Sequence, residues 1–115
     1  MDNRRYLEWA VAGRVCYLAG PISGFSAWRL RFAVAERVLW GMGALAVLSP
    51  RSLPAGLTYD QYMRICIPMV DAAQAVVLLP RWQGSPGARA EFRYAAAVMK
   101  WVFFWEEQKH ELAAG

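Results

Sequence analysis

Four short apolar segments, separated by stretches with helical patterning, constrain the fold of this chain more than any other feature. They are Val15–Leu18, Ala44–Leu48, Ala75–Leu79 and Trp101–Phe104. Continuous apolar runs of this length, next to turn residues, are typical of strands that are buried on both faces. Strands of this kind that alternate with helices indicate βαβ units and a parallel sheet.

Three helices are expected between these strands, over about residues 26–41, 58–73 and 85–100. Ser26 can cap the first, and Thr58 with Gln61 three residues later has the spacing of a capping box for the second. Ser85 followed by Pro86 is a strong start for the third. Pro68 lies inside the second helix and should kink it or leave a locally broken turn.

These elements predict one α/β domain over residues 1–115, with a lead-in of 14 residues and a tail from residue 105. The expected fold is a three-layer α/β/α sandwich with a flavodoxin-like parallel sheet of four or five strands in the order 2-1-3-4. Ligands of such folds bind at the carboxyl ends of the strands, where the strand order reverses. The loops expected there are Gly20–Gly24 and Arg81–Gly87.

Composition limits the classes of function. Hydrophobic residues make up 57% of the chain, which is enough for a real core, and the net charge is +4 without a run of basic residues. A nucleic-acid module is therefore not indicated, while either a basic crevice for a small anion or ordinary solvated arginines fits the charge. Two separate cysteines and one histidine argue against a zinc or other metal site. No cofactor is indicated.

The same sequence predicts a soluble, cytoplasmic protein. The N-terminus is charged and lacks a long apolar core, and the longest uncharged stretches are too short to span a bilayer, so no membrane partner is expected. Sixteen aromatic residues (six Trp, five Tyr and five Phe) are many for this length. They suggest self-association or an aromatic-rimmed binding site, although scattered surface aromatics are an equally open alternative.

Two loops could carry chemistry. In the first, a Gly-Pro turn directly follows the strand, and Ser23 and Gly24 can offer N–H and hydroxyl donors, although a simple tight turn explains it too. In the second, Ser85 caps a helix whose first N–H groups attract phosphate or carboxylate, and Gly87 leaves the backbone open to a ligand. Glu91 lies one turn further on, on the same helix face as Gly87. The alternative is an exposed Glu91 paired with a nearby arginine.

Together, the motifs YLAGPISG, YM and LLPxWxxSxGAxxE resemble the DUF4406 group within the nucleoside 2-deoxyribosyltransferase-like superfamily. That superfamily also includes the 2'-deoxynucleoside 5'-phosphate N-hydrolases. The resemblance covers roughly Val15 to Phe104. It implies a nucleoside or nucleotide as the small-molecule ligand, action on the N-glycosidic bond, and a homo-oligomer, either a dimer or a larger assembly.

The resemblance also implies roles for individual residues. Glu91 matches the nucleophile that attacks C1' of deoxyribose and displaces the base. Ser85 and Gly87 match the segment that holds the 5' end or its phosphate, and Trp82 could stack on a base or form a hydrophobic lid. The residues that match the loop lining the sugar and base are Tyr17, Gly20, Pro21, Ile22, Ser23 and Gly24.

The sequence departs from the enzymes of this superfamily at several positions. Cys66 and Gln74 stand where these enzymes and this group have Asp, and neither Asp60 nor Asp71 falls in register. Ser23 stands where the hydrolases carry Arg. The loss of a general acid typically costs about 10²–10⁴-fold in rate. Three readings therefore stay open: an N-glycosidase-like or transferase-like enzyme, a non-catalytic nucleotide-binding module, and an interaction protein of phage origin.

Overall fold

A computed structural model describes residues 3–22 and 27–105. The helices and strands follow one another as α1 (Asn3–Val11), β1 (Val15–Ala19), α2 (Trp28–Gly41), β2 (Ala46–Leu48), α3 (Tyr59–Ala72), β3 (Ala75–Leu78), α4 (Pro86–Ala97) and β4 (Trp101–Phe104). Two short 3₁₀ helices, η1 (Pro50–Ser52) and η2 (Trp82–Gly84), lie in the connections before α3 and α4. The alternation predicted from the sequence is therefore confirmed.

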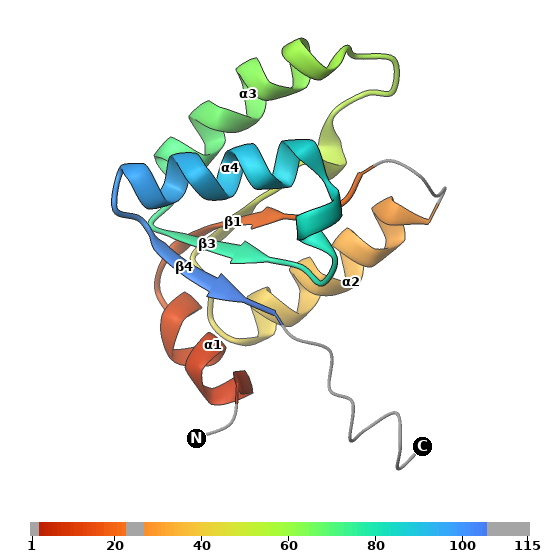
Figure 1. The fold of residues 1–115 in the computed structure, drawn as a ribbon. Coiled ribbons are helices and arrows are strands. Elements are labelled where there is room, and N and C mark those ends of the chain that lie inside the picture. Colours follow the sequence, from red (N-terminus) through yellow and green to blue (C-terminus); the bar gives the residue numbers. More distant parts are fainter. Residues whose placement is uncertain (1–2, 23–26, 106–115) are drawn as a thin grey trace.

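The four strands form a parallel sheet in the order β2-β1-β3-β4. Figure 1 shows α3 and α4 on one face of this sheet and α1 and α2 on the other. The predicted three-layer α/β/α sandwich and its strand order are confirmed, with four strands in the described part of the chain. The strand order reverses between β1 and β3, so the two loops singled out in the sequence follow neighbouring strands.

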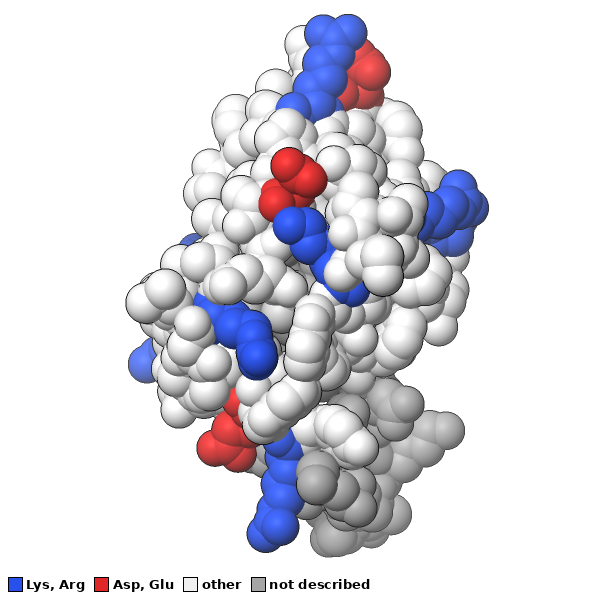
Figure 2. Space-filling model, turned by 90° about the vertical axis from the view of Figure 1, so that its left-hand side faces the viewer, with Lys and Arg blue, Asp and Glu red and all other residues white. Residues whose placement is uncertain are grey.

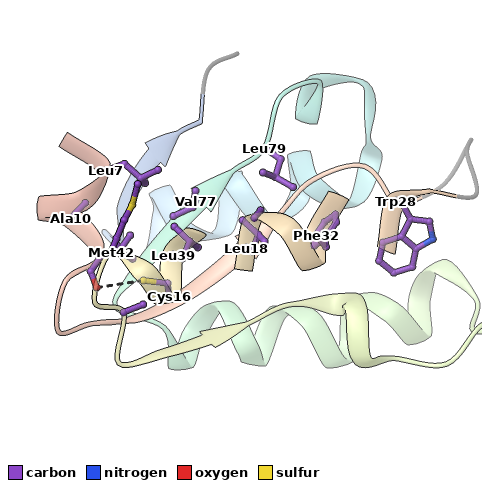
Figure 3. Close-up of a cluster of buried hydrophobic side chains, with 14 residues drawn as sticks. Leu7, Ala10, Cys16, Leu18, Trp28, Phe32, Leu39, Met42, Val77 and Leu79 are labelled. Carbon is purple, nitrogen blue, oxygen red and sulfur yellow. Dashed lines mark hydrogen bonds between the residues drawn. The ribbon is translucent and has the colours of Figure 1, made fainter. Parts of the chain in front are cut away.

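Side chains of β1 alternate between two separate cores because successive residues of a strand point to opposite faces. Cys16 and Leu18 pack with Phe32 and Leu39 of α2 in the cluster drawn in Figure 3. Tyr17 and Ala19 belong to the second cluster, which lies under α3 and α4. Tyr17 is fully buried there. The alternation of side chains along β1 alone thus places the titratable Tyr17 side chain on the face of the sheet that α3 and α4 cover.

The helix caps follow the sequence closely, with some corrections. The capping box of Thr58 and Gln61 is present, and α3 runs without a break through Pro68, so the locally broken turn is not found. Ser26 lies outside the described residues, and Ala27, which occupies the N-cap position of α2, makes no capping hydrogen bond through its side chain. β2 is shorter than expected because Ala44 instead forms an isolated bridge with Ala12.

The last helix, α4, ends at Ala97 rather than near Lys100. Met99 has a φ of 61°, a left-handed conformation that stops a helix. The sequence carries no glycine or asparagine there, so the usual signal for this termination is missing. The predicted tail of residues 105–115 lies outside the described residues apart from Trp105.

The N-terminal lead-in contains a docked helix, α1. Leu7, Ala10 and Val11 of α1 are buried in the α2-side core, while Tyr6 and Trp9 are exposed. The spacing of the buried residues is that of one helix face.

Charged groups are scattered over the surface. Figure 2 views the molecule from the side of Figure 1 on which the strands begin, and the lysines and arginines there are separated by uncharged residues. Glu36 of α2 is 9% exposed and pairs with Arg51 at 2.8 Å. Ser49 also donates to the Glu36 carboxylate. In the described part of the chain, no helix is long and apolar enough to span a bilayer.

Candidate functional site

A pocket of about 300 Å³ opens between α3, the start of α4 and the loop after β1. It lies at the carboxyl ends of the central strands, where parallel α/β sheets bind their ligands. Most of its surface is apolar. The lining residues are Gly20, Ile22, Pro50, Leu57, Tyr59, Tyr62, Met63, Cys66, Ser85, Pro86, Gly87, Ala88 and Glu91.

Glu91 supplies the charged group of this pocket. It lies on the buried face of α4 together with Ala88 and Ala95, three and four residues away, and is only 5% exposed. Its carboxylate accepts a hydrogen bond from the Tyr17 hydroxyl of β1. The alternative of a solvent-exposed glutamate paired with an arginine does not describe this residue.

Burial sets the protonation of the Glu91 carboxyl. Desolvation raises its pKa from 4.5 to about 7, and hydrogen bonds with Tyr17 and Cys66 oppose that rise. Burial also raises the pKa of the Cys66 thiol to about 11 and that of the Tyr17 hydroxyl well above 10. Near neutral pH the two neighbours are therefore neutral donors, while the carboxyl exchanges a proton.

The three titratable side chains of this site come from three different elements: Tyr17 from β1, Cys66 from α3 and Glu91 from α4. Because each side chain is at most 5% exposed, packing fixes all three. Such a buried carboxyl at a pocket wall can act as a nucleophile or a general base when it is ionised, and as an acid when it is not.

The start of α4 offers fewer N–H groups than the sequence suggested. The Ser85 hydroxyl accepts from the Ala88 N–H at 3.2 Å, and the Ser85 N–H itself donates to the Trp82 carbonyl. Pro86 has no N–H. Among the described residues, none accepts a hydrogen bond from Gly87, so one N–H is left in the first turn for a ligand.

The two glycines of the pocket play different parts. A Cβ added to Gly20 would lie 3.0 Å from the Cβ of Leu79 and 3.4 Å from Phe32, so the Gly-Pro turn needs glycine to lie against the end of β3. A Cβ added to Gly87 would meet Met63 at 3.6 Å, an ordinary contact. Glycine at position 87 therefore keeps the pocket open rather than relieving a clash.

The structure brings most of the residues singled out in the sequence to one place. Gly20, Ile22, Ser85, Gly87 and Glu91 line the pocket, and Tyr17 reaches it through its bond to Glu91. Pro21 is half-buried beside the pocket and is not among its lining residues. Ser23 and Gly24 lie outside the described residues.

Trp82 does not line this pocket. Its ring packs against Phe92 at 4.9 Å and Phe104 at 5.7 Å between ring centroids, on the side of α4 that faces β4. Contact with these two aromatic rings explains its half-buried state. The stacking of Trp82 on a base, considered from the sequence, has no support in this arrangement.

Sequence reasoning noted the YM motif and Cys66 but did not identify the wall of the pocket that α3 contributes. Tyr59, Tyr62, Met63 and Cys66 all face the pocket, and their spacing of three and four residues marks one helix face. That spacing could have been found in the sequence. It was not distinguished from ordinary core packing because the same pattern faces the interior in most helices.

No group of three or more His, Cys, Asp or Glu side chains that could hold a metal ion occurs among residues 3–22 and 27–105. The two cysteines, Cys16 and Cys66, are free and buried, and they lie in the two different cores. The donor set of the pocket, one carboxylate with a phenol and a thiol of raised pKa, is suited to proton and carbon chemistry more than to metal binding.

Comparison with known proteins gives one match. The model of the family described as "Domain of unknown function (DUF4406)" matches residues 14–104. No curated protein and no solved structure matches significantly. The matched region runs from just before β1 to the end of β4 and contains the whole pocket, whereas α1 precedes it.

Proposed function

The chain belongs to the DUF4406 family, whose description assigns no function, and from the chemistry of its pocket we propose that it cleaves or transfers at the N-glycosidic bond of a deoxynucleoside or its 5'-phosphate. One observation carries this proposal: the Glu91 carboxylate is buried in the wall of a pocket of about 300 Å³ and is held by Tyr17. The resemblance of the motifs to the nucleoside 2-deoxyribosyltransferase-like superfamily supplies the reaction class.

In the proposed reaction, the ionised Glu91 carboxylate attacks C1' of the deoxyribose. The bond between C1' and the base nitrogen breaks, and the base leaves with the bonding electron pair and takes up a proton from solvent. A covalent ester between Glu91 and the sugar results. Water, or a second base, then attacks C1' and releases the carboxylate, which is the two-step logic of retaining glycosidases.

A second candidate is a binding module without turnover. Cys66, whose thiol pKa is about 11, stands where the superfamily's enzymes carry an Asp, and the Glu91 pKa of about 7 leaves that carboxyl partly protonated at neutral pH. Both features weaken catalysis while leaving the pocket intact. This candidate predicts thermal stabilisation by a nucleoside or nucleotide without release of free base.

The experiment that separates the two candidates measures free base by chromatography. The purified protein, at high concentration, is incubated with each of the common deoxynucleosides and their 5'-monophosphates. We expect base release, and we expect Glu91→Gln to reduce it by about 10³-fold or more because the nucleophile is lost. Release of no base from any compound would contradict catalysis.

Asp60→Asn is the matched control. Asp60 is an exposed carboxylate on α3 whose pairing with Arg64 is a surface contact, so its removal should leave the rate of base release unchanged. An equal loss of activity in both variants would indicate a general effect on the protein and would contradict the role given to Glu91.

A further inference from the structure

We propose that the pocket selects an uncharged nucleoside over the corresponding 5'-phosphate, because Glu91 is the one charged side chain among its described lining residues and its walls are apolar. This inference rests on the proposed function and names the substrate class within it. It follows from the charges around the pocket, from the start of α4, and from the wall formed by α3.

The charges around the pocket do not favour an anion. Among the described residues that line it, Glu91 is the one charged side chain, and none is Lys or Arg. A phosphate in this space would face an ionised carboxylate at close range without a compensating positive charge.

Cations on the surrounding elements are bound elsewhere. Arg51, next to Pro50, pairs with Glu36, and Arg64 on α3 pairs with Asp60. Arg89, two residues after Gly87, donates to the carbonyl of Gln83 at 2.7 Å. None of these three guanidinium groups lines the pocket. Redirecting any of them toward a phosphate would break an existing contact.

The start of α4 is a weak phosphate site. Helix starts that hold phosphate offer several backbone N–H groups, whereas here Pro86 has none and the Ala88 N–H is taken by the Ser85 hydroxyl. The Gly87 N–H alone remains. One N–H can donate a hydrogen bond to a hydroxyl or carbonyl oxygen of a neutral ligand, but a single N–H is too little to replace the hydration of a phosphate dianion.

The walls suit a flat, uncharged ring system. Tyr59, Tyr62 and Met63 of α3 face Ile22 and Gly20 across the pocket. Aromatic rings and thioethers make favourable contacts with the faces of bases without requiring a charge. A volume of about 300 Å³ is at the small end of ligand pockets, which matches one nucleoside better than a larger phosphorylated ligand.

The test compares affinities in matched pairs. Binding of each deoxynucleoside and of its 5'-monophosphate to the full chain is measured by isothermal titration calorimetry, at low salt and pH 8, and base release is assayed in the same samples. We expect the monophosphate to bind at least about tenfold more weakly than its nucleoside. Equal or tighter binding of the monophosphates would overturn the inference while leaving the proposed function in place.

A substitution that adds a positive charge to the pocket provides a second test. The Met63 sulfur would lie 3.6 Å from a Cβ at position 87, so Met63→Lys brings an ammonium group to the start of α4. We expect this variant to shift the ratio of monophosphate affinity to nucleoside affinity by about tenfold toward the monophosphate, since both ligands lose the same thioether contact and only the monophosphate gains from the added charge. Met63→Gln, which adds polarity without charge, should leave this ratio unchanged. An unchanged ratio in Met63→Lys would contradict the charge argument.

The remaining outcomes separate the two proposals. Preference for nucleosides without base release would support the inference and remove the catalytic part of the proposed function. Binding of neither class of compound would overturn both. Glu91→Gln adds a check, because removal of the carboxylate charge should narrow the difference between nucleoside and monophosphate affinity by relieving repulsion.

Discussion

The proton on Glu91 links the stability of the protein to pH. Its carboxyl has a pKa of about 7 in the folded protein against an ordinary value of 4.5, because burial disfavours the charged form. Between these two pH values the folded state binds more protons than the unfolded state does. Stability therefore falls as pH rises from about 4.5 to 7, and the loss is complete above pH 7.

Glu91→Gln should remove this dependence. At pH 8 the variant is expected to be more stable than the wild type, by up to about 3 kcal/mol for a shift of this size, whereas at pH 4 the two should have similar stability. Thermal unfolding of both proteins, followed by circular dichroism across this pH range, measures the difference. Parallel stability profiles for the two proteins would show that Glu91 does not titrate as described.

The Tyr17 hydroxyl should control the pKa of Glu91. Its hydrogen bond favours the ionised carboxylate, so Tyr17→Phe is expected to raise the Glu91 pKa above about 7. The Glu91 side-chain carboxyl carbon, followed by NMR during a pH titration, reports this shift. If the protein releases base, the pH at which the rate reaches half of its alkaline maximum should move upward with it.

Tyr94→Phe is the matched control for this titration. The Tyr94 hydroxyl donates to Asp71 at 2.8 Å on the exposed side of the α3–α4 pair, remote from the pocket lining. The Glu91 titration should therefore be unchanged in this variant. A shift of similar size in both variants would mean that the effect is not specific to the Tyr17 bond.

At the scale of secondary structure, the backbone is slightly strained just after the end of α4. Met99 adopts a left-handed conformation and is 86% exposed, so its side chain contributes little packing. Met99→Gly should stabilise the protein by about 1 kcal/mol because glycine reaches this conformation without steric cost. Met99→Ala, which keeps the Cβ, should not. Urea unfolding measures both, and a loss of stability in Met99→Gly would contradict the argument.

Elements with strong local signals were predictable from the sequence. The capping box at Thr58 and the Ser85-Pro86 start each place unpaired N–H groups against a side chain within three residues, so the signal is local. The apolar runs gave β1, β3 and β4 nearly to the residue. Strand order followed because right-handed crossovers between parallel strands leave few alternatives.

Elements that depend on distant contacts were not predictable. Ala44 leaves β2 to bridge Ala12, and Glu36 is buried because Arg51 and Ser49 reach it from the next connection. In the pocket, the Glu91–Tyr17 pair follows from motif spacing and strand position. The loss of N–H donors at α4 also follows locally, from the Ser85 cap and Pro86. Which face of α3 forms the pocket wall depends instead on the packing of one helix against another, which sequence spacing does not reveal.

At the scale of the whole molecule, one arginine connects the N-terminal helix α1 to β4, an edge strand of the sheet. The Arg14 guanidinium lies over the rings of both Trp9 and Trp101, 5.3 and 4.8 Å from their centroids, and the two rings contact each other at 5.0 Å between centroids. It also donates to the carbonyls of Trp9 and Ala10. Since α1 precedes the region matched by the family model, this contact joins α1 to the matched region.

Arg14→Met should lower the free energy of unfolding by about 1–2 kcal/mol, because it keeps the alkyl stem and removes the cation and its hydrogen bonds. Urea unfolding measures the change. Arg93→Met, at an exposed position on α4, is the control and should change stability by less than about 0.5 kcal/mol. Equal effects of the two substitutions would show that Arg14 has no special role.

Several large aromatic side chains are exposed at the surface of the molecule. Trp40, Trp101 and Phe104 are each more than two-fifths exposed, and β4 is an edge strand of the sheet. Exposed aromatic side chains of this size are compatible with the self-association expected from composition. The homo-oligomer stays a prediction of the sequence.

The alternation of side chains along β1 has a consequence for the register in which this strand pairs with its neighbours. A slip of β1 by one residue would turn Tyr17 toward α2 and bring Leu18 under α4, leaving the Glu91 carboxyl sealed in with no phenol to donate to it. A misaligned sheet would thus lose stability at the wall of the pocket. The hydrogen-bonded pair of Tyr17 and Glu91 therefore favours the correct register of β1 as well as fixing the wall of the pocket.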